Sequence, residues 1–208
     1  APGGESMSQE AVRQALKANP LDIDALGAAL SALEGDEARV AAIRAIGGRD
    51  QARIWAAAAG RSTSLEDIVP SDRGAATEVI HAGKNSLPVF TNFEKRFCRV
   101  EGKDDVLYGY NEGVTRSVIG PGCFVAHHFA DRDEVGVDYY QVPPDDAVLP
   151  DGWPRPVPNE KGLQMLVYAK MIDYLRQVSA HVTIGRAVRK GKTTNNYFLL
   201  CRTPATKS

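Results

Sequence analysis

The chain has 208 residues, a formal net charge of −1 and 43% hydrophobic residues. This apolar fraction supports a sizeable core without disulfides or metals, and the length fits one domain or a domain with an appendage. The near-neutral charge argues against a general nucleic-acid binder. No apolar run is long enough to cross a bilayer, so no membrane span is expected.

The three cysteines, Cys98, Cys123 and Cys201, are widely spaced and odd in number. No CxxC or Cys–His pair has the spacing of zinc ligands, and we expect no metal and no cofactor. Each cysteine has apolar neighbours, which predicts buried free thiols in a reducing compartment. The expected location is therefore cytoplasmic, and the alternative is a secreted or periplasmic protein after removal of a signal. Met7 resembles a natural start, which would make residues 1–6 non-native.

Residues 8–60 are rich in alanine and have the apolar spacing of helices. Breaks such as Gly35–Asp36 and Gly47–Gly48 divide this segment into about four short helices. Such a series predicts a small helical bundle or a pair of helical hairpins. Residues 61–86 are interpreted as a transition, within which residues 75–81 are predicted to form one more helix.

Residues 87–204 have the turn chemistry of an antiparallel sheet or barrel of about seven strands. The proline-rich residues 143–158 are expected to form a long connection over one end of the sheet. Apolar residues at three-or-four spacing predict one amphipathic helix over 163–178. Asp173 and Arg176 would then lie on one helix face, where they can pair and hold a polar ligand group. The predicted strands are 96–100, 106–110, 115–119, 123–129, 135–142, 182–188 and 197–201.

The C-terminal stretch combines a hydrophobic residue, Asp, an aromatic residue and Arg with a later glycine strand and an aromatic-rich last strand. It resembles the C-terminal part of the lipocalin-like GXWXG-family proteins, which are bacterial proteins of unknown function. The family's Gly-x-Trp-x-Gly signature is absent, because neither Trp55 nor Trp153 has flanking glycines. The resemblance implies a barrel that holds a small apolar ligand. The matching residues are Ile172, Asp173, Tyr174, Arg176, Gly185, Tyr197, Phe198 and Arg202.

The expected fold class is therefore α+β: a small N-terminal helical bundle followed by a strongly bent antiparallel sheet or lipocalin-like β-barrel, with one helix before the last two strands. The first functional hypothesis is a module that binds a small apolar or amphipathic molecule, with the helical segment as a lid or docking surface. A few polar side chains would orient the ligand, although strand alternation sends only some of them inward. The candidate ligand-binding residues are Arg99, Tyr108, His127, Asp138, Tyr140 and Arg186.

Two further hypotheses remain open. The second is an enzyme in which His127 or His128, with Asp138 or a tyrosine, acts as general acid and base. Adjacent strand residues point to opposite faces, so at most one of these histidines faces a barrel interior. No nucleophile elbow, metal motif or dinucleotide fingerprint accompanies them. The third is a scaffold whose helical segment binds a protein partner or a second copy, which an exposed apolar patch on the helices would favour.

Overall fold

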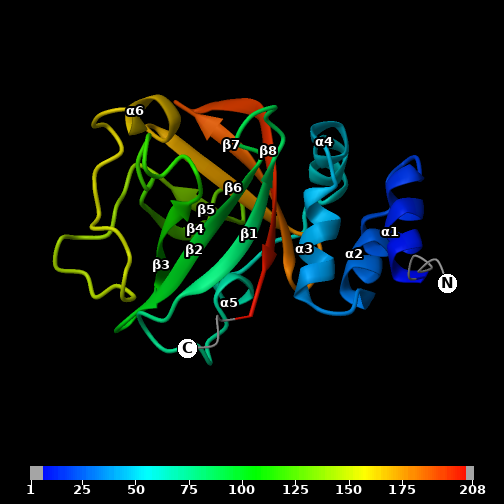
Figure 1. Ribbon diagram of the computed structural model, residues 1–208, viewed down its shortest axis with the longest axis horizontal. Helices are drawn as coiled ribbons and strands as arrows, with labels where there is room; N and C mark the ends of the chain where they lie inside the picture. Colours follow the sequence, from blue (N-terminus) through cyan, green and yellow to red (C-terminus); the bar gives the residue numbers. More distant parts are fainter. Residues whose placement is uncertain (1–6, 205–208) are drawn as a thin grey trace.

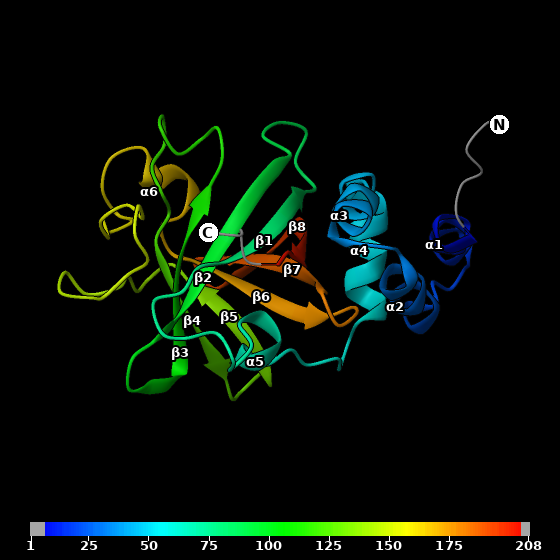
Figure 2. The same cartoon turned by 60° about the horizontal axis from the view of Figure 1, so that its bottom comes forward.

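The computed structural model describes residues 7–204, so the expectation about residues 1–6 lies outside the described part. A helical region packs beside a closed barrel of antiparallel strands (Figures 1 and 2). This confirms the predicted fold class and the order of helices before barrel. Among residues 7–204, no helix is long and apolar enough to cross a membrane. The helices are α1 (Met7–Lys17), α2 (Ile23–Ala32), α3 (Asp36–Arg44), α4 (Gly48–Ala57), α5 (Leu65–Ile68) and α6 (Gln164–Val167).

Each strand of the barrel pairs antiparallel with the next in sequence, and β1 closes the barrel on β8. Such an up-and-down closure leaves no free sheet edge. The first strand lies inside the 61–86 segment, so the barrel begins before residue 87. The strands are β1 (Val79–Asn85), β2 (Asn92–Val100), β3 (Lys103–Glu112), β4 (Phe124–Phe129), β5 (Glu134–Asp138), β6 (Met171–Gln177), β7 (Val182–Arg189) and β8 (Lys192–Arg202).

The predicted helix over 163–178 is wrong in extent, because only the four residues of α6 are helical and β6 follows. Side chains of β6 alternate between the two faces of the barrel wall: Asp173 and Leu175 face the interior, whereas Ile172 and Tyr174 face outward in the apolar cluster that the helical region shares. Because both faces of β6 are covered, apolar residues do not repeat every second position and the pattern looks helical. Asp173 and Arg176 therefore lie on opposite faces and do not form the predicted pair.

Two other local predictions are also wrong. Residues 75–81 were expected to be helical, but residues 79–81 begin β1, whose register with both neighbouring strands overrides the local preference. Residues 115–119 were expected to be a strand, but they form turns in the β3–β4 loop. Of their apolar members, Val118 is exposed and Ile119 is only partly buried, so the segment has no apolar face covered as in a strand.

The helical region covers the outer face of the barrel at β7 and β8, away from both barrel ends (Figure 1). Helices α3 and α4 touch the barrel, and α1 packs on α2. Arg176 of β6 crosses this junction: its guanidinium lies 3.7 Å from the Trp55 ring centre and donates to the Trp55 carbonyl at 2.8 Å. The Glu134 carboxylate accepts from the same guanidinium at 2.7 Å. The expectation that this region could lid the barrel is thus not met.

One end of the barrel is closed by α5. Ile68 and Val69 insert into the interior apolar cluster. The last carbonyls of a helix lack partners within it, and here barrel side chains supply them. His81 hydrogen-bonds the Ile68 carbonyl at 2.9 Å, Arg202 donates to the Asp67 carbonyl, and Arg99 donates to the carbonyls of Val69 and Pro70. This end is therefore a fixed floor.

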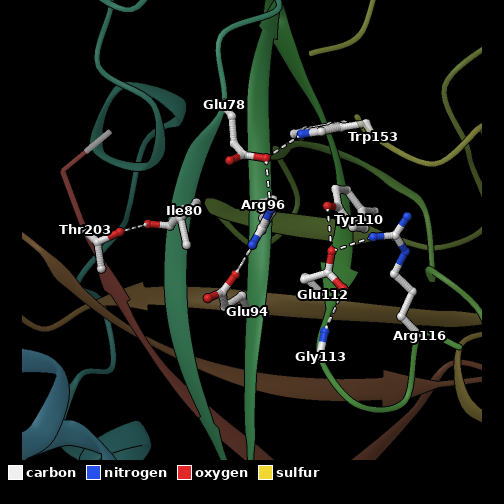
Figure 3. A network of polar contacts seen from close by, with 10 residues as sticks. All are labelled: Glu78, Ile80, Glu94, Arg96, Tyr110, Glu112, Gly113, Arg116, Trp153 and Thr203. Carbon is white, nitrogen blue, oxygen red and sulfur yellow. Dashed lines mark hydrogen bonds and ion pairs between the residues drawn. The ribbon is translucent and has the colours of Figure 1, made fainter. Parts of the chain in front are cut away.

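The connection between β5 and α6 covers the outer face of β2–β4, rather than an end of the sheet as expected. Trp153 anchors it by donating to Glu78 at 2.7 Å and by packing edge-on against Tyr110, with ring centres 4.9 Å apart. Arg96 bridges Glu78 at 3.3 Å and Glu94 at 2.7 Å, which ties the anchor to β2 (Figure 3).

Candidate functional site

A cavity of about 380 Å³ occupies the barrel at the end opposite α5. This size lies in the range of small-molecule sites in proteins. The β1–β2 loop, the β3–β4 loop and α6 surround its mouth, at the upper end of the barrel in Figure 1. The walls are largely aromatic and aliphatic, with a small number of polar groups. The aromatic and aliphatic wall residues include Phe93, Ile119, Val167, Tyr168, Met171, Ala187 and Phe198.

Four polar side chains from different strands meet in this cavity wall. Lys95 of β2 and Asn111 of β3 are direct cross-strand partners. Asp173 comes from β6, and Tyr139 lies one residue beyond β5. All four are buried, and all four line the cavity. Strand alternation explains their direction, since Lys95 lies between the inward-facing Phe93 and Phe97.

The Lys95 amine is the centre of this polar cluster. Its Nζ donates to Tyr139 OH at 2.6 Å and to Asn111 Oδ1 at 2.8 Å, and it lies 3.2 Å from Asp173 Oδ2. An ammonium has three donors, so these contacts use all of them. The Asn111 amide donates to Tyr139 OH at 2.9 Å and to the Gly122 carbonyl at 3.0 Å. The cluster is thus internally satisfied, which a charge in an apolar cavity requires.

Burial shifts both charged members toward their neutral forms. Burial lowers the pKa of Lys95, and the nearby Asp173 opposes that shift. Burial likewise raises the pKa of Asp173, against the effect of Lys95 and of a hydrogen bond from Tyr139. The pKa of Tyr139 is raised well above its usual value by burial and by Asp173. A proton can therefore move between the amine and the carboxylate at a smaller cost than in water.

Aromatic rings surround the Lys95 amine. The centres of the Phe93, Phe124, Tyr139 and Phe198 rings lie 5.1 to 5.6 Å from Nζ. Each of the three phenyl rings lies across from a glycine on the neighbouring strand: Gly83 faces Phe93, Gly109 faces Phe124 and Gly185 faces Phe198. A Cβ on Gly185 would lie 2.1 Å from Phe198 Cζ, so the glycine makes room for the ring.

The mouth carries many exposed apolar side chains. Leu87, Val89 and Phe90 of the β1–β2 loop, Val114 of the β3–β4 loop and Leu166 of α6 all line the cavity and remain exposed. In the described helices α1–α4, the only exposed large apolar side chain is Met7. The apolar surface therefore gathers at the cavity entrance, whereas the partner-binding hypothesis requires it on the helices.

The base of the mouth is held by specific contacts. The Glu112 carboxylate, at the end of β3, accepts from Arg116 at 2.6 Å and from Tyr110 OH at 3.0 Å (Figure 3). On the other side, Gln164 of α6 accepts from the Gly122 backbone N–H at 3.0 Å. Tyr168, just after α6, stacks on Tyr139 with ring centres 5.2 Å apart. These contacts tie the entrance directly to the polar cluster.

None of the six candidate residues lines this cavity, and their roles in ligand binding stay predictions. Arg99 lies at the closed end, where its contacts to α5 occupy it. Tyr108 faces outward in the cluster beneath the long connection, and Tyr140 is half exposed. Arg186 faces outward and donates to the Thr194 carbonyl at 2.7 Å.

His127 and Asp138 do meet, but on the outer surface of β4 and β5. His127 Nε2 lies 3.1 Å from Asp138 Oδ2 beside a surface hollow that Gln141 also lines. His128 pairs separately with Asp133 at 2.9 Å. The His127 ring stacks on Phe129 with centres 4.2 Å apart, so packing and hydrogen bonding both hold it. Among residues 7–204, no group of three His, Cys, Asp or Glu side chains could hold a metal ion.

The cavity residues that the sequence analysis missed were Lys95, Asn111 and Tyr139, and Asp173 was assigned to the wrong element. One signal for Lys95 existed. In the run Phe93, Lys95, Phe97, a lysine occupies the middle of an apolar alternation, which is where an inward-facing charge would be found.

Comparisons with protein-family models, with curated proteins and with solved structures found no match to this chain. The resemblance of the C-terminal stretch to the GXWXG-family proteins stays an expectation.

Proposed function

We propose that this protein binds a small apolar or amphipathic molecule inside the barrel. The observation that carries this proposal is the cavity of about 380 Å³, with apolar walls and one buried polar cluster. Sites for small ligands combine such walls with a small number of convergent polar groups. The apolar entrance supports it, because exposed apolar surface at a cavity mouth favours transfer of an apolar ligand from water.

The charges in the cavity restrict the polar end of the ligand. Lys95 and Asp173 neutralise each other at 3.2 Å. Near the mouth, Glu112 is paired with Arg116. At the depth of the cluster, a carboxylate ligand would therefore bring a third buried charge beside a pair that is already neutral, which is costly. Arg189, the other cation in the cavity lining, donates to the Met165 carbonyl beside α6. A ligand with an uncharged polar group, such as a hydroxyl, amide or carbonyl, fits the cluster better.

The structure also offers the pair of His127 and Asp138 for the enzyme hypothesis. A carboxylate that holds an imidazole in one orientation is an arrangement that general acid–base catalysis uses. This pair lies on the opposite side of the barrel wall from the cavity, so it does not contact a ligand bound there. We therefore favour ligand binding in the cavity.

Binding can be tested with the uncharged fluorophore N-phenylnaphthylamine, whose emission rises in a dry apolar site. We expect saturable binding that a long-chain alcohol displaces at least about tenfold more effectively than the carboxylate of equal length. Ala187→Phe, which places a ring in the cavity, should abolish binding, whereas Lys192→Phe at the exposed start of β8 should not. Solvent extraction of natively purified protein, followed by mass spectrometry, would identify a ligand that co-purifies.

Two outcomes would contradict the proposal. The first is a folded protein that gives no saturable fluorophore signal. The second is equal binding by the Ala187→Phe variant, which would place the fluorophore outside the cavity.

A further inference from the structure

The amine of Lys95 is placed for covalent chemistry with a ligand. We propose that Lys95 forms an imine with an aldehyde or ketone group of the molecule in the cavity, and this inference rests on the proposed ligand-binding function. The amine lies in the cavity wall, within reach of a group that enters from the mouth. Among residues 7–204, Lys95 is the only buried lysine.

The surroundings of Lys95 favour the reactive form of the amine. Only the neutral amine attacks a carbonyl carbon, and a lysine in an apolar site loses its proton more readily than one in water. Burial has this effect on the pKa of Lys95, and Asp173 at 3.2 Å is the group that can accept the proton. Burial raises the pKa of that carboxyl, which helps it to hold the proton.

The same surroundings stabilise the product. A protonated imine is a cation at nearly the position of the original ammonium. The four aromatic rings at 5.1 to 5.6 Å from Nζ favour a cation there. The Asp173 carboxylate would be its counter-ion. The apolar walls limit the access of bulk water, which slows hydrolysis of the imine.

The reaction balances without any oxidant or reductant. The neutral Lys95 amine attacks the carbonyl carbon, so a carbon–nitrogen bond forms, the carbonyl π bond breaks, and one proton passes from the nitrogen to the oxygen. The carbinolamine then loses that oxygen as water with the proton held by Asp173, and the carbon–oxygen bond breaks. The products are one protonated imine, one Asp173 carboxylate and one water. Tyr139 OH, hydrogen-bonded to both Lys95 and Asp173, is positioned to relay the proton.

Reductive trapping tests this inference on the whole, unmodified protein. Octanal is added with cyanoborohydride, which converts an imine to a stable secondary amine, and peptide mass mapping locates the label. We expect Lys95 to be labelled at least about tenfold faster than the exposed Lys103, because binding holds the aldehyde beside the amine. Octanol, which has the same chain and no carbonyl, should suppress labelling of Lys95 and leave Lys103 unchanged.

Failure of this inference can be told apart from failure of the proposed function. If the fluorophore binds and octanol displaces it, but Lys95 is not labelled faster than Lys103, the cavity binds ligands and the imine proposal is wrong. If neither the fluorophore nor the aldehyde enters, both proposals fail. Labelling of Lys95 that octanol does not suppress would also overturn the inference, because the aldehyde would not have reacted from the cavity.

Discussion

The buried pair of Lys95 and Asp173 predicts that its two single substitutions have opposite pH dependences. Lys95→Met leaves a buried carboxyl without the amine that now lies 3.2 Å away. This carboxyl can take up a proton, which near pH 7 costs about 4 kcal/mol relative to an ordinary aspartate in the unfolded chain. Asp173→Asn leaves a buried amine, and its deprotonation near pH 7 costs about 4 to 5 kcal/mol relative to an ordinary lysine. These values are the largest losses of stability expected.

The sign of each pH dependence follows from the proton count. Folded Lys95→Met protein holds one more proton than its unfolded chain, so its loss of stability shrinks by about 1.4 kcal/mol for each unit that the pH falls towards 4. Folded Asp173→Asn protein holds one proton fewer than its unfolded chain. Its loss of stability therefore shrinks by a similar amount for each unit that the pH rises towards 10.

Urea unfolding, followed by tryptophan fluorescence at acidic, neutral and alkaline pH, measures these free energies of unfolding. Lys103→Met and Asp104→Asn, at exposed positions of β3, are matched controls and should change stability by no more than about 0.5 kcal/mol. The double substitution Lys95→Met with Asp173→Leu removes both charges and should lie within about 2 kcal/mol of the wild type. Losses below about 1 kcal/mol for both single variants, or losses that do not change with pH, would refute the assigned burial of the pair.

Three other outcomes follow from single contacts. Burial lowers the pKa of His81 from 6.5 to about 4. Wild-type protein should therefore lose up to about 3 kcal/mol of stability as the pH falls from 6.5 to 4, because the unfolded chain binds the proton more readily. The H81Q variant should lose less in the same urea experiment. Gly185→Ala forces the Phe198 ring to move, which should cost about 1 to 3 kcal/mol in urea unfolding and weaken fluorophore binding. Arg176→Lys keeps the charge but loses the planar contact with Trp55, and a loss below about 0.5 kcal/mol would show that this contact does not hold the helices to the barrel.

More of the architecture than of the candidate site could be predicted from the sequence. Alternating strands separated by turn residues indicated an antiparallel sheet, and the alanine-rich segment with its glycine breaks indicated short helices. These signals are local, since caps, turns and alternation act over a few residues. The candidate ligand-binding residues lie away from the cavity for a different reason. Tyr108, Asp138 and Arg186 lie on strands as predicted, but register sends them to the outer face, and a shift of one residue would have reversed this.

The sequence by itself determined the class of fold, because its hydrophobic periods and turns allow few other arrangements of these elements. Tertiary structure alone decided that residues 171–177 form a strand. The barrel interior covers one of its faces and the outer apolar cluster that the helical region shares covers the other, so its apolar residues do not alternate in the sequence. It also decided the site. Lys95, Asn111, Tyr139 and Asp173 are far apart in the chain, and only closure of β1 on β8 encloses them in one cavity. Their chemistry depends on that enclosure, since burial shifts the pKa values of the amine and the carboxyl.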